Sequence, residues 1–188
     1  MSHSSSQASV FKFWFRPGAT VRALLDAGQG HLMALIAGAA FGLVQAGRIY
    51  LYAEQASGGI LVAGALAGLV GLCLIAYLLR NFGRWFGGQA TFAEARTALG
   101  LGLIPWTLLF AGLIPALLSI DPEVIASWFP LIFVGFVYGY IILLFSISAA
   151  LRLTLLKTFI CLVVTFLVSM FPLTLLAQLM VKVFSLAA

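Results

Sequence analysis

Few residues of this chain have side chains suited to catalysis or metal binding. The two histidines, His3 and His31, lie in a polar N-terminal segment and at the start of an apolar run, so they form no metal-binding pair. The two cysteines, Cys73 and Cys161, lie inside apolar runs, where a free cysteine usually acts as a small buried hydrophobe. No H-E-x-x-H or G-x-S-x-G sequence and no phosphate-binding glycine loop is present. We therefore expect no enzymatic activity, no catalytic residue, no metal and no cofactor.

A basic and aromatic segment, residues 80–96, is better suited to recognition than to catalysis. Arg84 and Trp85 lie near its start, and Phe92 and Arg96 lie near its end. Arginine pairs with phosphate and carboxylate groups, and aromatic rings settle at the headgroup level of a membrane. We take these side chains as candidate contacts for a membrane or cytoplasmic protein partner, or for lipid headgroups.

Arg48 is a further candidate, because it falls near the outer end of an apolar run, one turn before Tyr52 and close to Glu54. An arginine at the centre of a membrane helix costs roughly 2.5–3.5 kcal/mol on insertion scales, whereas one near the end extends to the interface. Two interpretations stay open. Arg48 either reaches the interface in this way, or it faces inward and holds a lipid phosphate or an acidic partner.

The elements that position these residues are membrane helices. Of the 188 residues, 63% are hydrophobic and 8% are charged, and a soluble chain of this length could not bury so much apolar surface. Five apolar runs reach the length of about 20 residues that a transmembrane helix needs. They cover residues 32–52, 60–79, 99–120, 128–151 and 158–181. The runs lack the polar alternation of barrel strands, so we predict an all-α, polytopic transmembrane bundle with five spans.

The distribution of charge predicts how this bundle is oriented. The ten Lys and Arg residues, except Arg48 and Lys182, all fall on one side of the predicted membrane. The other side also holds Glu54, Asp121 and Glu123. Because basic residues concentrate on the cytoplasmic side, we expect a cytoplasmic N-terminus and a C-terminus outside. The cations are scattered singly, which favours membrane lipids with anionic headgroups over nucleic acid as partners.

The predicted domain organisation is simple. Residues 1–9 read as a disordered polar tail, and residues 10–188 as a single membrane domain with five helices. Aromatic rings and cations alternate at the start of this domain, so residues 10–27 are expected to form an interfacial anchor on the cytoplasmic leaflet.

The segment between the second and third spans shows local signals of structure. Gly87 and Gly88 are expected to end one element. Thr91 and Glu94 match a capping box, in which each side chain bonds a free backbone N–H at a helix start. The sequence leaves open whether the helix at residues 91–98 lies at the interface or belongs to the third span.

Small residues and prolines recur inside the spans. The glycine pairs one turn apart are Gly38 and Gly42, Gly64 and Gly68, and Gly135 and Gly139. Such pairs allow close helix contact, either within the bundle, which we favour, or in a homo-oligomer. Pro105, Pro115 and Pro172 are expected to bend the third and fifth spans.

Several short motifs resemble the Yip domain, the family of Ypt/Rab-GTPase-interacting membrane proteins and their bacterial relatives. Pro17, Thr20 and Arg22 precede the first span, residues 87–92 read G-G-Q-A-T-F, and Pro105 follows in the third span. The resemblance implies a scaffold or adaptor in membrane organisation or trafficking.

This chain resembles the compact bacterial members of the family, which implies the cell inner membrane. It has only about thirty residues before its first span, whereas many members carry a long cytoplasmic N-terminal region, so the resemblance leaves open whether this chain binds a GTPase. The alternative function is a small permease or lipid-translocating protein that uses Arg48 and the bent third and fifth spans.

Overall fold

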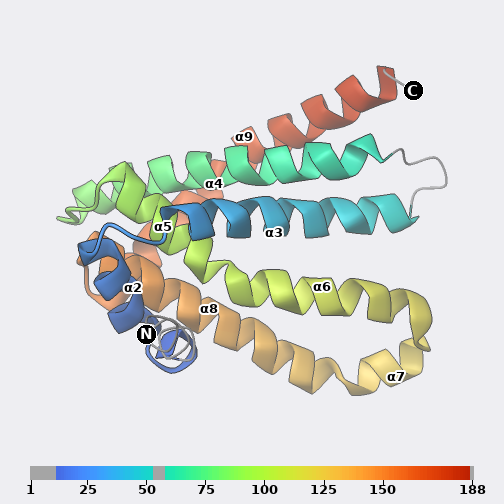
Figure 1. Cartoon of the computed structure of the whole chain (residues 1–188), viewed down its shortest axis with the longest axis horizontal. Coiled ribbons are helices and arrows are strands. Elements are labelled where there is room, and N and C mark those ends of the chain that lie inside the picture. The colour runs from blue at the N-terminus through green and yellow to red at the C-terminus, as the bar shows by residue number, and fades with distance from the viewer. Residues whose placement is uncertain (1–11, 53–57, 187–188) are drawn as a thin grey trace, which may run out of the picture.

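A computed structural model describes residues 12–52 and 58–186 of the chain (Figure 1). Within these ranges every regular element is a helix, as the sequence predicted. The helices are α2 (Pro17–Asp26), α3 (His31–Tyr52), α4 (Gly59–Trp85), α5 (Phe92–Gly102), α6 (Ile104–Ser119), α7 (Pro122–Ser127), α8 (Phe129–Leu151) and α9 (Leu155–Leu186). The predicted tail at residues 1–9 lies outside the described residues, as does Glu54.

Five helical segments of the described residues are long and apolar enough to cross a membrane, which confirms the predicted number. They are His31–Leu51, Gly59–Trp85, Phe92–Ala116, Phe129–Leu151 and Leu155–Leu175. The second extends past residue 79, because its polar end is still helical. The third apolar segment begins at Phe92 and so includes the helix after the capping box, while the depth of this helix in the membrane stays open.

The long helices α3, α4, α6, α8 and α9 run lengthwise, and most connections lie at two opposite ends of the bundle (Figure 1). One end carries α2, the α4–α5 connection and the α8–α9 connection. We call it the basic end, because every described Lys and Arg except Arg48 and Lys182 lies in these elements or within a few residues of them. The predicted orientation of the chain rests on these same basic residues. That the basic end faces the cytoplasm stays a prediction.

Glycines allow α3 and α4 to cross with their backbones in contact. A Cβ atom on Gly42 would lie 2.7 Å from the Cα of Gly68 and closer still to the carbonyl oxygen of Gly64. On α8, a Cβ on Gly139 would lie 2.9 Å from the indole Nε1 of Trp106 on α6. These glycines therefore serve packing within the bundle.

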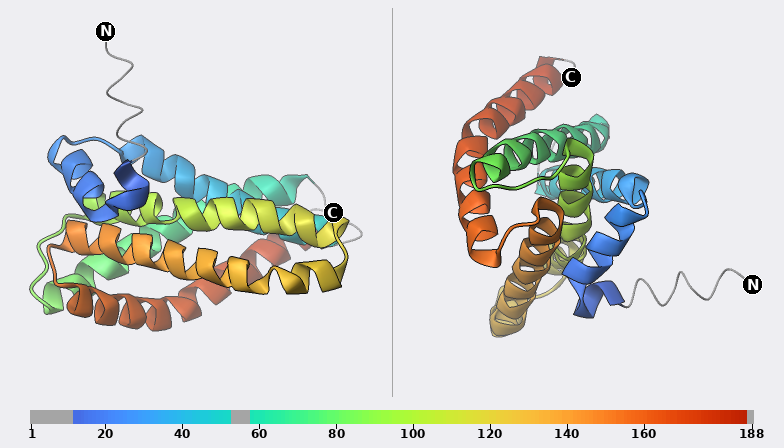
Figure 2. Two further views of the ribbon diagram at one scale, coloured as in Figure 1. Left: turned by 90° about the horizontal axis from the view of Figure 1, so that it is seen from below. Right: turned by 90° about the vertical axis from the view of Figure 1, so that its left-hand side faces the viewer.

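Helix α5 is the centre of the bundle, in contact with α2, α3, α4 and α8 (Figure 2). Gly100 brings it against α3, where an added Cβ would lie 2.5 Å from the carbonyl oxygen of Ala34. The helix breaks at Leu103, and α6 follows with Pro105 in its first turn. The Leu103 carbonyl accepts bonds from the backbone N–H of Thr107, at 2.9 Å, and from its hydroxyl, at 3.0 Å. The Leu103 carbonyl therefore has hydrogen-bond partners at the break.

Helix α2 is docked on α8 through one buried face. Val21 is fully buried, and a Cβ on Gly18 would lie 3.3 Å from the carbonyl oxygen of Phe145. The preceding turn is held as well, since the Tyr138 hydroxyl donates a 2.5 Å hydrogen bond to the Trp14 carbonyl and the two rings stack. The segment predicted as an interfacial anchor is thus fixed to the helices, while its depth in the leaflet stays a prediction.

Candidate recognition site at the α4–α5 connection

A Schellman motif ends α4 and sets the direction of the chain after Trp85. The N–H of Gly88 donates to the carbonyl of Gly83 at 2.8 Å, and the N–H of Gly87 donates to the carbonyl of Arg84 at 3.0 Å. Gly87 has φ +87°, in the left-handed region that glycine adopts without strain. The prediction that the glycines end an element is confirmed.

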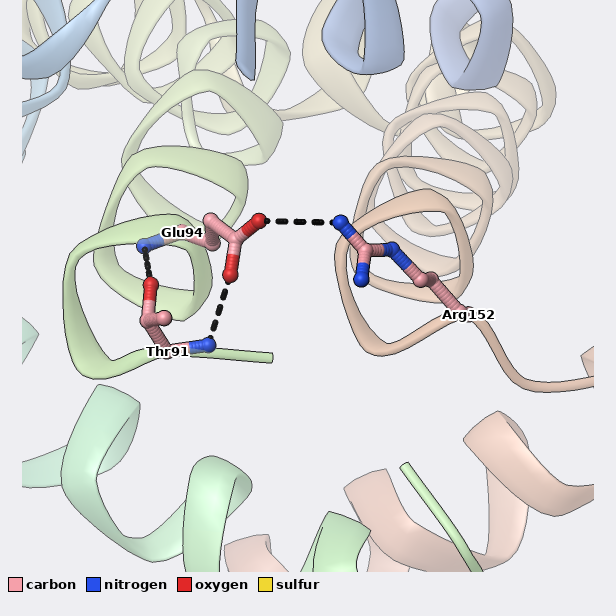
Figure 3. Close-up of polar contacts among 3 residues, drawn as sticks. All are labelled: Thr91, Glu94 and Arg152. Atoms are coloured by element: carbon pink, nitrogen blue, oxygen red, sulfur yellow. Dashed lines mark hydrogen bonds and ion pairs between the residues drawn. The ribbon is translucent and has the colours of Figure 1, made fainter. Parts of the chain in front are cut away.

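A capping box starts α5 and ties it to α8 (Figure 3). The Glu94 carboxylate accepts from the backbone N–H of Thr91 at 2.7 Å, and the Thr91 hydroxyl accepts from the N–H of Glu94 at 3.2 Å. The predicted capping box is therefore confirmed. The other carboxylate oxygen of Glu94 lies 3.4 Å from Nη2 of Arg152, the residue that ends α8. This ion pair could not be predicted from the sequence, because its two residues come from different helices.

Arg84 and Trp85 form an exposed pair on the last turn of α4. The Trp85 side chain is 76% exposed. One edge of its ring contacts Phe82, with ring centroids 4.9 Å apart and planes at 73°. Arg84 beside it is also exposed. A large amphipathic ring is thus held in place and presented at the basic end.

Phe92 and Arg96 form a second, half-buried pair on the first turns of α5. The guanidinium carbon of Arg96 lies 5.6 Å from the centroid of the Phe92 ring, within the range of a cation–π contact. The Phe92 ring packs partly against the core and lines a groove along α4. The candidates at residues 80–96 therefore separate into an exposed pair and a half-buried pair.

Arg48 is not brought together with the other candidates. It lies exposed near the end of α3, opposite the basic end. This placement fits the interpretation in which its side chain extends to the interface.

A polar contact inside the bundle was not predicted. Nδ1 of His31, at the start of α3, lies 2.7 Å from the hydroxyl of Thr97, which is fully buried on α5. The only signal in the sequence was a threonine within the helix that leads into the third span. The contact joins the first span to the central helix.

Thr97→Val tests the strength of this contact. Valine has a similar shape but no hydroxyl, so His31 loses its partner and the free energy of unfolding should fall by about 1–2 kcal/mol. Thermal denaturation of the purified chain in detergent would measure the loss. Thr97→Ser keeps the hydroxyl and should lose less, whereas an equal loss would show that the methyl group, not the hydrogen bond, matters.

An all-helical chain with five membrane-spanning segments and no strand in its described residues is a polytopic membrane protein. The Yip1 domain family matches residues 11–176, most of the chain, so the chain belongs to this family of multi-pass membrane proteins. The resemblance noted from the sequence is confirmed. The family is not known for enzymes. No curated protein and no solved structure matches the chain.

Proposed function

We propose that this chain is a non-enzymatic membrane adaptor or scaffold that binds a protein partner through Arg84 and Trp85. The observation that carries the proposal is the 76% exposure of Trp85 at a fixed helix end. Tryptophan and arginine are the residues most often found at the energetic centre of protein interfaces. An exposed pair of this kind therefore suits a partner that approaches the membrane surface.

The surroundings of this pair favour binding without large rearrangement. The Schellman motif fixes the chain after Trp85, and the N–H of Gln89 in the connection donates to the carbonyl of Leu151 at 3.2 Å. The capping box and the Glu94–Arg152 ion pair hold the next helix. A surface that is already ordered loses less conformational entropy when a partner binds.

The proposed orientation and location of the adaptor rest on the distribution of its basic residues. Basic residues concentrate at the end that holds Trp85, so we place this end in the cytoplasm and, for a compact bacterial member, the chain in the inner membrane. Arg48 gives the alternative of a permease no support, because its side chain is exposed at the far end of α3.

Site-specific photo-crosslinking in native membranes would test the adaptor function. The probe would replace Trp85 or Gln89, with Trp128 as the control position. Trp128 is 46% exposed and lies between α7 and α8, away from the basic end. We expect one protein to be captured reproducibly from Trp85 and Gln89 but not from Trp128.

The captured protein would then be purified and its binding measured against the variant with Arg84→Ala and Trp85→Ala. A loss of affinity of at least tenfold would support the adaptor function, as is typical when central interface residues are removed. Unchanged affinity, or equal capture from Trp128, would contradict it. Capture of lipid alone would favour a lipid-handling function instead.

A further inference from the structure

An apolar groove runs along the outer face of α4. Its volume is about 510 Å³, and it is lined by Leu69, Val70, Cys73, Leu74 and Tyr77 of α4 and by Phe92 of α5. The α4 residues form one stripe, because positions three to four apart share a helix face. Val70 and Tyr77 are about half exposed, so in a membrane protein the groove opens toward lipid. Phe92 closes it toward the basic end.

Two arginines lie near the ends of α4 and α5 that meet at the basic end. Arg80 lies five residues before the end of α4, and Arg96 lies four residues after the start of α5. At a rise of about 1.5 Å per residue, Arg80 is about 7.5 Å and Arg96 about 6 Å from the end of its helix. The two helices pack against each other, and the Arg96 guanidinium covers the Phe92 ring that lines the groove.

The Nε atoms of Arg80 and Arg96 are buried and have no hydrogen-bond partner in the part of the chain that the structure describes, so only the terminal nitrogen atoms of these arginines can reach a ligand. The acidic residue nearest in sequence, Glu94, bonds Thr91 and pairs with Arg152 instead. Guanidinium groups bind phosphate strongly, through two parallel hydrogen bonds.

We propose that Arg80, Arg96 and the α4 groove together bind one anionic glycerophospholipid. Its phosphate accepts hydrogen bonds from the terminal Nη atoms of the two guanidinium groups, and one of its acyl chains lies in the groove between Phe92 and Leu69. Lipid is the occupant, rather than free phosphate, because the groove beside the arginines is apolar and opens toward the bilayer. Phe92 links the two parts, since its ring contacts Arg96 on one side and lines the groove on the other.

This inference does not rest on the adaptor function. The exposed pair of Arg84 and Trp85 forms neither the groove nor the buried nitrogen atoms. If the double arginine variant bound phosphatidylglycerol as well as the wild type did, the lipid site would be overturned and the adaptor function left intact. If removal of Arg84 and Trp85 left the binding of the protein partner unchanged, the reverse would hold.

Native mass spectrometry of the full chain in mild detergent would test the site with phosphatidylglycerol and phosphatidylcholine at equal concentration. We expect one phosphatidylglycerol to be retained in preference to phosphatidylcholine. The double variant Arg80→Gln and Arg96→Gln should bind phosphatidylglycerol with about tenfold lower affinity, as expected when charged hydrogen bonds are removed. Lys157→Gln is the control, because it removes an exposed cation at the same end of the bundle. Its affinity for phosphatidylglycerol should stay within about twofold of the wild-type value, since a surface charge is screened by salt.

A second variant, Cys73→Trp, fills the groove and leaves both arginines in place. It therefore tests the lipid site even if the double variant fails to fold. It should also weaken phosphatidylglycerol binding. Equal retention of phosphatidylglycerol by the wild type and by the folded variants would overturn the proposal. An equal loss in Lys157→Gln would overturn it too, since the effect would then come from net charge. Displacement of the lipid by millimolar inorganic phosphate, with no effect of Cys73→Trp, would overturn the assignment of the groove to an acyl chain.

Discussion

Gly42→Ala is expected to lower the free energy of unfolding by about 3 kcal/mol, at the upper end of the range for overpacking. The added Cβ would meet backbone atoms of α4, at 2.7 Å from the Cα of Gly68 and closer to the carbonyl oxygen of Gly64. Backbone atoms cannot rotate away as a side chain does. Helices α3 and α4 would therefore have to separate along their crossing and lose close packing on both sides. Gly42→Leu should prevent folding.

Gly47→Ala is the matched control on the same helix. A Cβ at Gly47 meets nothing within 4 Å, and alanine favours a helix by about 1 kcal/mol over glycine, so stability should stay unchanged or rise. Unfolding of the purified chain by titration with a denaturing detergent would compare the two variants. Equal stability of Gly42→Ala and Gly47→Ala would contradict the backbone contact between α3 and α4.

The glycine pairs show where sequence reasoning reached its limit. The spacing of Gly64 and Gly68 predicted a close helix contact, because glycines one turn apart remove side chains from one face. Spacing alone cannot tell whether that face meets another helix of the same chain or a second copy. The structure decides it for these residues, since Gly42 and Gly68 face each other across α3 and α4.

The number and type of the helices could be predicted because they depend on local hydrophobicity and length. The helix ends were less predictable. Residues Arg80 to Trp85 are polar, aromatic or glycine and fall outside an apolar run, yet α4 continues through them to its Schellman motif. A helix does not stop where the chain leaves the apolar layer, because its backbone hydrogen bonds persist in water. The capping box at Thr91, by contrast, is local and was predicted correctly.

The site residues followed the same division between local and long-range signals. Trp85 is exposed and Phe92 is half-buried because of how α4 and α5 pack. A local sequence pattern does not determine this packing. The ion pair of Arg152 with Glu94 and the bond between His31 and Thr97 join distant parts of the chain. Their residues looked ordinary in the sequence, and only the arrangement of the helices around α5 brings them together.

Gly100→Ala carries the second large expected effect, a loss of about 2–3 kcal/mol in the free energy of unfolding, as for overpacking of a tight contact. The added Cβ would lie 2.5 Å from the carbonyl oxygen, 2.6 Å from the Cβ and 2.7 Å from the Cα of Ala34. Helix α5 cannot move away from α3 freely, because it also contacts α4 and α8. The strain should therefore reach the His31–Thr97 contact, one turn from Gly100.

Gly112→Ala provides the control within the same span. A Cβ at Gly112 on α6 meets nothing within 4 Å, so the same substitution there should leave the free energy of unfolding unchanged or raise it slightly. Combining Gly100→Ala with Thr97→Val separates the two contacts. If the strain already breaks the bond between His31 and Thr97, the double variant should lose less than the two single losses added together. Fully additive losses would show that α5 absorbs the extra methyl group without disturbing its contact with the start of α3.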